Sequence, residues 1–353
     1  MRTCIKLCVY VCVYVYMCRV VSSQYKSHER EYLLFHGAPA GNKRKDKGVS
    51  AHCTMKKGPR YTIHTTENGS KFRMPYGFPA ENFDSSLKYD VQDTDIILAT
   101  YPKCGTTWTQ HIIYMIVNEN CDPLSSDQTT MEVFPHLEEV GKEYCESLPN
   151  PRLIKTHLSY DLTPKNPKAK YIYIVRNPKD CVVSFFYHTV GFINCYDYDD
   201  GDFETFFDLF LKGEVDFGDY FENLRGWLDH RSKSNILFLT YEQMKENTRE
   251  CIIKIARHLG ESYERKLLYN NEEMLRKVLN GSSFNEMKKD LLRWSSKRSD
   301  KHKPFIRRGI VGDWKNHLTI EQSNCIDEKL AKRFTAEEIE MIWPMIFSEK
   351  QRT

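Results

Sequence analysis

The 353-residue sequence predicts an α/β fold, a single domain in which helices flank one central parallel β-sheet. Two observations lead to this expectation. Apolar, β-prone runs alternate with helical stretches, which is the order that builds a parallel sheet covered on both faces. The first of these runs leads into a helix through a turn that carries a lysine and a glycine. We see no internal repeat and no second domain.

The expected strands are Thr94–Thr100, Arg152–Thr156, Lys170–Val175 and Asn235–Thr240. The first run is apolar over Asp95–Ala99, as in a buried strand. Apolar side chains over Trp108–Val117 suit a packed helix. Glu242–His258 shows the helical period, and Gly260 follows it as an expected C-terminal cap.

The turn after the first strand, Thr100–Gln110, reads TYPKCGTTWTQ. Backbone N–H groups at the start of the next helix would face an anion, and Lys103 would add a positive charge. A Walker A loop needs Gly-Lys-Ser/Thr, which occurs nowhere in the chain. The turn therefore predicts a phosphate loop that is not an ATPase's. An ordinary strand-to-helix connection with a chance lysine is the alternative.

Two later segments predict a second anion site. Arg176–His188 reads RNPKDCVVSFFYH, so that Arg176 ends a strand and Ser184 lies one to two turns into the following helix. Phe305–Thr319 reads FIRRGIVGDWKNHLT, in which Arg307, Arg308 and the Gly309 amide form an anion nest.

Together with Lys155-Thr156-His157, these segments resemble the cytosolic sulfotransferases, from about Phe72 to the C-terminus. The resemblance implies a P-loop-like phosphosulfate-binding loop and 3′-phosphoadenosine 5′-phosphosulfate (PAPS) as cosubstrate. This nucleotide has phosphates on both sides of its ribose, which explains the two anion sites. The implied reaction is in-line transfer of sulfonate to a hydroxyl or amine of a small phenolic or aromatic acceptor.

The resemblance also assigns residues. His157 is the general base, Lys103 contacts the 5′-phosphate and the bridging oxygen, Lys155 holds the sulfonate, and Ser184 completes the catalytic set. The residues implied to bind the nucleotide are Lys103, Cys104, Gly105, Thr106, Thr107, Trp108, Arg176, Ser184, Tyr241, Ser282, Phe284, Arg307, Arg308 and Gly309. Trp108 and Phe284 would sandwich the adenine. A structural histidine and ordinary core aromatics are the alternatives.

Three departures from the family pattern matter. Cys104 replaces serine, and a helix N-terminus and a neighbouring lysine both favour a thiolate, so redox sensitivity is a hypothesis. Ser282 replaces threonine. The family's dimer motif is degenerate over Lys315–Asn324, with Ile320 for valine and Asn324 for glutamate, which leaves a homodimer in doubt.

Residues 1–54 read as an extension rather than a domain, and 55–353 as the sulfotransferase domain. The apolar run Leu7–Cys18 is short for a spanning helix, which needs about 20 residues. It is either a signal or anchor core, or a translated simple repeat ahead of a true start at Met55.

Composition excludes several functional classes. Residues 1–54 hold nine Lys/Arg and three Asp/Glu, so the rest carries 42 against 45, a net charge of −3, and is not a nucleic-acid binder by charge. The cysteines lack Cys-x-x-Cys spacing, which predicts reduced thiols, a cytoplasmic protein and no metal site. We also expect no stable membrane association of the domain.

Three rival functions stay open. A Golgi sulfotransferase anchored by the N-terminal run would act on glycans or proteins, but the sequon Asn280-Gly281-Ser282 would then place a glycan beside the adenine pocket. A nucleotide kinase and an inactive nucleotide-binding module are the others. The sequence does not specify the acceptor. Candidates for an apolar acceptor pocket are Phe78, Phe83, Phe134, Phe186 and Tyr187.

Overall fold

We describe a computed structural model of the chain over residues 57–66, 69, 71–125, 128–289, 294 and 306–344. The expectations for residues 1–54 and for a start at Met55 fall outside the described residues. Phe305, the first residue of the segment Phe305–Thr319, also lies outside them.

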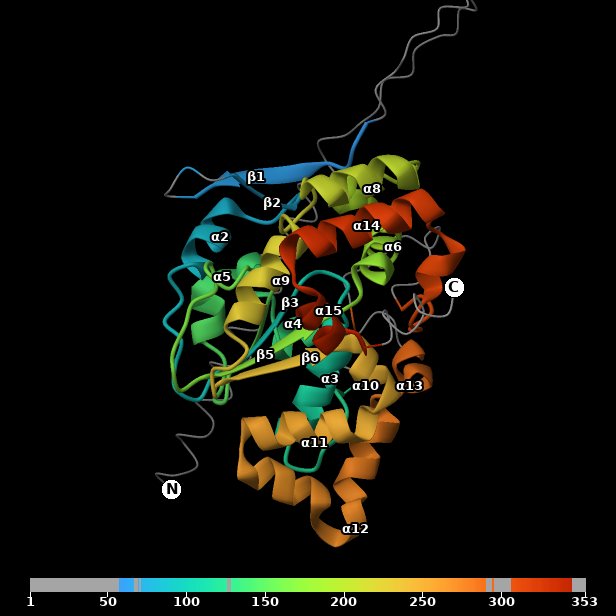
Figure 1. The fold of residues 1–353 in the computed structure, drawn as a ribbon. Coiled ribbons are helices and arrows are strands. Elements are labelled where there is room, and N and C mark those ends of the chain that lie inside the picture. Colours follow the sequence, from blue (N-terminus) through green and yellow to red (C-terminus); the bar gives the residue numbers. More distant parts are fainter. Residues whose placement is uncertain are drawn as a thin grey trace, which may run out of the picture. The chain divides into compact units, whose positions relative to one another are not determined.

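The central sheet contains the four strands that the sequence predicts. They are β3 (Ile96–Thr100), β4 (Leu153–Thr156), β5 (Lys170–Val175) and β6 (Ile236–Thr240), in the order β4-β3-β5-β6. Figure 1 labels three of them, β3, β5 and β6. Every neighbouring pair is parallel. The predicted fold class, one α/β domain with a parallel sheet between helices, is confirmed.

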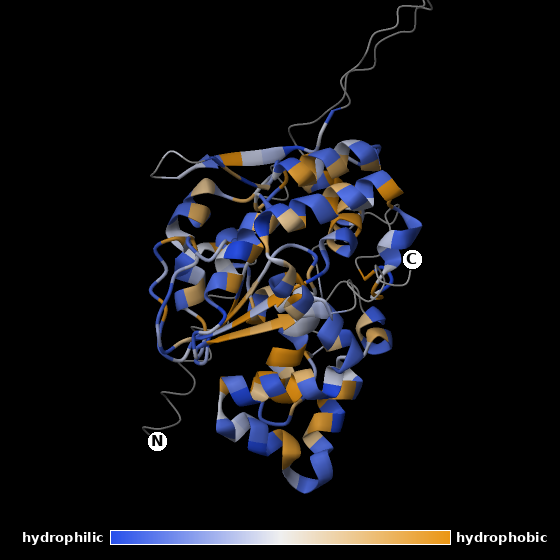
Figure 2. Ribbon diagram, in the orientation of Figure 1, coloured by the Kyte–Doolittle hydropathy of each residue, from blue (hydrophilic) through white to orange (hydrophobic). Residues whose placement is uncertain are grey.

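Alternating side chains of the strands build two separate cores. Ile96 and Leu98 face one core, whereas Ile97 and Ala99 face the other, because successive residues of a strand point to opposite faces. The first core is closed by α3 (Thr106–Val117), α11 (Thr248–Leu259) and α12 (Glu261–Gly281), and the second by α6 (Pro178–Thr189), α8 (Phe203–Lys212) and α9 (Tyr220–Asp229). Figure 2 shows the central strands as predominantly hydrophobic, as burial on both faces requires.

Further elements complete the described part of the chain. These are α2 (Ala80–Ser86), α4 (Thr130–Val133), α5 (Leu137–Glu146), α7 (Ile193–Tyr196), α10 (Tyr241–Glu246), α13 (Phe284–Lys288), a 3-10 helix (Asp313–Asn316), α14 (Ile320–Arg333) and α15 (Ala336–Ile342). An antiparallel pair, β1 (Tyr61–Thr65) and β2 (Lys71–Pro75), was not expected from the sequence.

The prediction of one helix over Glu242–His258 is wrong. Asn247 has φ −127° and ψ 54°, outside helical geometry, and separates α10 from α11. Asparagine tolerates such a junction because its side chain competes for backbone hydrogen bonds. Thr240 and Gln243 form a capping box that starts α10 directly after β6, so that Tyr241 lies at the edge of the sheet.

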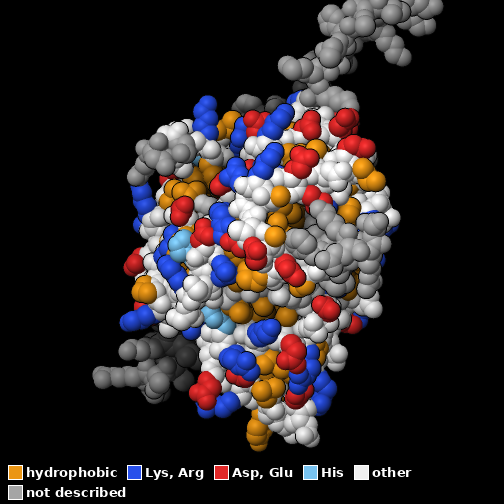
Figure 3. Space-filling model, viewed as in Figure 1, with side chains coloured by type: hydrophobic (Ala, Val, Ile, Leu, Met, Phe, Trp, Pro, Cys, Tyr) orange, Lys and Arg blue, Asp and Glu red, His pale blue; other side chains and the backbone are white. Residues whose placement is uncertain are grey.

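The described residues carry free thiols and a surface of mixed charge. The cysteines Cys104, Cys121, Cys145, Cys181, Cys195, Cys251 and Cys325 are all free thiols. On the face seen in Figure 3, basic and acidic side chains are interspersed. Within the described ranges, no helix has the length and apolarity to cross a bilayer, and no group of three or more His, Cys, Asp or Glu is arranged to hold a metal.

Candidate active site

The candidate site lies at the edge of the sheet where all four parallel strands end. Lys103 follows β3, His157 follows β4, Arg176 follows β5 and Tyr241 follows β6. The chain passes from β3 to β4 on one side and then to β5 on the other. Such a reversal opens a crevice at the carboxyl ends of the strands, where ligands bind in open α/β sheets.

The phosphate loop requires unusual backbone at two residues. Gly105, the N-cap of α3, has φ +100°, and a Cβ there would lie 2.8 Å from Cδ2 of Tyr241. Only glycine fits both demands. Lys103 has φ +67° although it is not glycine. This left-handed conformation costs roughly 1–2 kcal/mol, so the position favours lysine for its side chain rather than for its backbone.

The start of α3 points its N–H groups towards this edge, as an anion site at a helix N-terminus requires. Thr106 is buried, and its hydroxyl lies 2.6 Å from Oγ1 of Thr100. That bond ties the helix start to the end of β3. Thr107 and Trp108 are only half-buried.

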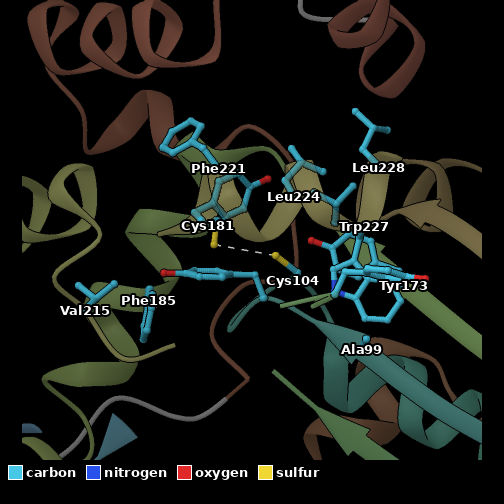
Figure 4. Close-up of a cluster of buried hydrophobic side chains, with 14 of the residues drawn as sticks. Ala99, Cys104, Tyr173, Cys181, Phe185, Val215, Phe221, Leu224, Trp227 and Leu228 are labelled. Carbon is cyan, nitrogen blue, oxygen red and sulfur yellow. Dashed lines mark hydrogen bonds between the residues drawn. The ribbon is translucent and has the colours of Figure 1, made fainter. Parts of the chain in front are cut away.

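The Cys104 side chain faces the protein interior. Its thiol has no exposed surface and lies 3.9 Å from Sγ of Cys181, within the apolar cluster that includes Trp227 and Phe221 (Figure 4). A nucleotide could therefore contact Cys104 only through its backbone. Burial raises the pKa of the Cys181 thiol well above its ordinary value. Redox sensitivity of Cys104 stays a hypothesis.

His157 is held in the tautomer that a general base needs. Its Nδ1 lies 2.7 Å from the carbonyl oxygen of Thr100. A carbonyl can only accept, so Nδ1 carries the proton and Nε2 keeps its lone pair. The backbone N–H of His157 donates to Oε1 of the buried Glu138 at 2.8 Å, and Asn223 donates to the His157 carbonyl. The residue is thus fixed from three sides.

Electrostatics keep this imidazole neutral. Burial lowers the pKa of His157 well below 6.5, and the nearby charges of His136 and Lys155 lower it further. Lys155 comes from β4, beside His136 in a short parallel bridge. Burial also lowers the pKa of Lys155, whereas Glu139 and Glu138 act in the opposite direction.

Arg176 connects three parts of the site. Its buried guanidinium lies 4.5 Å from the centre of the Tyr241 ring and donates to the carbonyls of Ile310 at 3.1 Å and Lys103 at 3.4 Å. It therefore joins the phosphate loop to the C-terminal segment. Among the described residues, Nε of Arg176 has no hydrogen-bond partner. Ser184 lies two turns further along α6 and is partly exposed.

Arg307 and Arg308 both pair with one carboxylate. Their guanidinium groups lie 2.5 and 2.6 Å from the two oxygens of Asp313. Burial would raise the pKa of Asp313, but hydrogen bonds from Arg307 and Asn316 outweigh this, and its pKa is about 2. Asp313 therefore stays charged and holds the two arginines side by side.

The aromatic residues expected around adenine form two contacts. The Trp108 and Tyr241 rings meet edge to face at 5.8 Å, and the indole N–H donates to the Ser282 carbonyl. A Cβ on Gly309, which has φ +62°, would lie 2.7 Å from the Phe284 ring. The Ser282 hydroxyl donates to the carbonyl of Val278 in its own helix.

The residues expected to line an acceptor pocket lie in different parts of the structure. Phe78 packs on His136 and Phe217, and Phe217 contacts the His157 ring at 4.9 Å. Phe83 lies in the same apolar cluster as Phe78. Phe134 is buried in the core beneath α3, Phe186 packs on Phe203 and Phe206 in the other core, and Tyr187 faces Arg307. Of these residues, Phe78 is linked to His157 through its contacts with His136 and Phe217.

Residues 93–336 match the family model described as the sulfotransferase domain. The chain belongs to the sulfotransferase family. It is 35% identical to the amine sulfotransferase of Oryctolagus cuniculus, over 73% of this chain and 86% of the relative. It is also 35% identical to sulfotransferase 2A1 of Macaca fascicularis, over 70% and 87%.

A solved structure supports the same fold. The mouse sulfotransferase SULT7A1, complexed with PAP, superimposes with a TM-score of 0.60 at 29% identity, covering 78% of this chain and 95% of that one. The prediction that this chain is a sulfotransferase is therefore confirmed at the level of the enzyme class.

Sequence reasoning missed several residues of this sulfotransferase's site. His188 lies 3.3 Å from Nζ of Lys103 and occurs four residues after Ser184, a helical spacing that could have revealed it. Asp180 accepts the backbone N–H groups of Gly312 and Trp314, at 2.6 and 3.0 Å. No local pattern in the sequence indicates this contact, because the partners are more than 130 residues apart.

Proposed function

We propose that the protein transfers a sulfonate group from PAPS to the hydroxyl or amine of a small aromatic acceptor, with His157 as general base. One observation carries this proposal. The end of the sheet gathers Lys103, Lys155 and a neutral His157 whose Nε2 lone pair is set by the Thr100 carbonyl. The PAP bound to the related mouse enzyme supports the choice of donor.

The reaction needs positioned charges and one base. The acceptor oxygen attacks sulfur while the bond from sulfur to the phosphate oxygen breaks, and the acceptor proton passes to Nε2 of His157. Lys103 neutralises the charge that develops on the departing phosphate, and Lys155 holds the sulfonate. Adenosine 3′,5′-bisphosphate (PAP) leaves as the second product. No step of this mechanism requires a metal. That the enzyme acts without a metal stays a prediction.

The second anion site gives specificity for the donor. Arg176 and Ser184 on one side, and Arg307, Arg308 and Gly309 on the other, bind the 3′-phosphate in this proposal. Trp108 and Phe284 take the adenine, with Tyr241 and Ser282 at its edge, and Gly105, Thr106, Thr107 and the backbone of Cys104 surround the 5′-phosphate. Arg176 supports this arrangement because it already links the phosphate loop to Ile310.

Arg307→Ala is expected to raise KM for PAPS by roughly 10- to 100-fold, because a hydrogen bond to a charged group contributes about 1.5–3 kcal/mol. Steady-state kinetics at saturating acceptor measure this. Arg333→Ala, a change of an exposed arginine on α14, is the control. An unchanged KM would remove Arg307 from the site.

Binding and turnover test the proposal directly. Calorimetry should show PAP binding at least about 10-fold tighter than AMP, because only PAP fills both anion sites. The purified chain should also turn over members of a panel of phenols, catecholamines, steroids and glycans with PAPS. Phosphoryl transfer from ATP would favour the kinase reading, and tight PAP binding without turnover of any acceptor would favour an inactive module. Equal affinity for PAP and AMP would refute the proposal.

The domain boundary, the cellular location and the oligomeric state are also proposals. We take 55–353 as the sulfotransferase domain and the cytoplasm as its location. A homodimer would use Lys315–Asn324, which spans the end of the 3-10 helix and the start of α14. Ile320 in this motif is 75% exposed, which leaves an apolar side chain available for a second copy.

A further inference from the structure

One wall of the candidate site carries a second histidine that the proposed transfer does not use. The His136 ring meets the His157 ring edge to face at 4.8 Å and is 3% exposed. Phe78 and Phe217 pack on His136 at 5.3 and 5.6 Å. An acceptor whose oxygen reaches His157 would therefore lie near His136 and Phe217, the rings that contact His157, and such rings suit an aromatic acceptor.

Two carboxylates flank His136, and they differ in whether they can bind a ligand. Glu138 is fully buried, lies 3.4 Å from Nε2 of His136 and accepts the backbone N–H of His157. It is committed to holding the catalytic loop. Glu139 lies 3.8 Å from Nδ1 of His136 and its side chain is 30% exposed. No hydrogen bond to the Glu139 carboxylate occurs within the part of the chain that the structure describes.

The charge of Glu139 also acts on residues of two other elements. Its negative charge raises the pKa of Lys155 on β4 against the lowering by burial. It also adds to burial in raising the pKa of the Cys195 thiol on α7 to about 11. The Glu139 carboxylate therefore affects the pKa values of both Lys155 and Cys195, and it lies 3.8 Å from Nδ1 of His136, whose ring contacts that of His157. His136 itself has a buried Nε2 without a hydrogen-bond partner among the described residues.

We propose that Glu139 selects the acceptor, and that the protein favours aromatic acceptors with a protonated amine over neutral acceptors of the same size. This inference rests on the proposed sulfonate transfer. The aromatic ring packs against Phe78 and Phe217, the hydroxyl reaches His157, and the ammonium group pairs with Glu139 in a charge-assisted hydrogen bond. His136 keeps the carboxylate at the mouth of the pocket.

A matched pair of acceptors tests charge selection. Tyramine and para-propylphenol have the same length and ring, but only tyramine carries an ammonium group. The ratio of their kcat/KM values is measured with PAPS for the wild-type chain, Glu139→Gln and the control Glu143→Gln. Glu143 is exposed on the same helix, so its change removes the same charge elsewhere.

Wild-type protein should prefer tyramine, and Glu139→Gln should lower the tyramine ratio by about 10- to 100-fold, which corresponds to one charge-assisted hydrogen bond. Turnover of para-propylphenol should stay within about threefold, and Glu143→Gln should resemble wild type. A wild-type protein without preference for tyramine would overturn the inference. An equal loss of kcat/KM for both acceptors in Glu139→Gln would also overturn it. Such a loss would mean that Glu139 only offsets the positive charge of Lys155.

A binding measurement separates this inference from the proposed function. Calorimetry of tyramine and para-propylphenol, with PAP present, reports charge selection without any chemical step. Tighter binding of tyramine that is lost in Glu139→Gln supports the role of Glu139 even if no acceptor is turned over. Failure of turnover alone would count against sulfonate transfer, whereas equal binding of the two acceptors counts against Glu139.

Discussion

Replacing Lys103 with alanine is expected to lower kcat for sulfonate transfer by about 10²- to 10³-fold, with a much smaller loss of PAP affinity. The bridging oxygen becomes negative only as the bond to sulfur breaks, so an ammonium group beside it acts mainly on the transition state. The phosphates of PAP keep their remaining contacts. Lys103 also has a left-handed backbone conformation. The conformational free energy that this costs is tolerated because the side chain is needed at this place.

Measurement of this effect needs kcat at saturating donor and acceptor, and calorimetry with PAP. Alanine suffers the same backbone strain as lysine at φ +67°, so the variant changes the side chain without relieving the loop. Lys168→Ala is the control, since Lys168 is exposed and pairs with Asp93 at 2.9 Å, ahead of β5 and β3 and so at the opposite end of these parallel strands from the loop. Parallel losses of kcat and PAP affinity would assign Lys103 to ground-state binding instead.

Loss of the imidazole in His157→Asn is expected to lower kcat/KM by about 10²- to 10⁴-fold, the usual contribution of a positioned general base. Asparagine is the sharper choice than alanine, because its amide can still donate to the Thr100 carbonyl that now accepts from Nδ1. The variant should therefore fold and bind PAP like wild type. Circular dichroism and PAP calorimetry check this, and retention of most activity would exclude His157 as the base.

The pH profile provides a second test of the same role. Because burial lowers the pKa of His157 well below 6.5, the neutral, proton-accepting form dominates at neutral pH. Activity of the wild-type enzyme should hold as the pH falls from about 7.5 to about 6.5 and decline only below that range. An acceptor hydroxyl that does not ionise in this range keeps the profile simple. A decline centred at or above 6.5 would contradict the neutral imidazole.

Local sequence determined the strands, the loop that joins β3 to α3 and the class of enzyme. Apolar runs such as Lys170–Val175 became strands because burial on both faces of a parallel sheet demands them. The lysine and glycine of TYPKCGTTWTQ are recognisable because their spacing along the chain fixes the geometry of a strand-loop-helix unit. Lys103, His157 and Arg176 each follow a predicted strand, so their common edge also followed from the pattern.

Tertiary structure alone decided what surrounds these residues. Asp180 and His188 gain their significance from contacts with Gly312 and Lys103, which lie far along the chain, and Glu139 gains its own from its place beside His136. The direction of the Cys104 thiol, away from the crevice and onto Cys181, was equally hidden. Sequence periodicity reports which face of an element is buried, whereas side-chain partners and pKa values depend on distances that only packing sets.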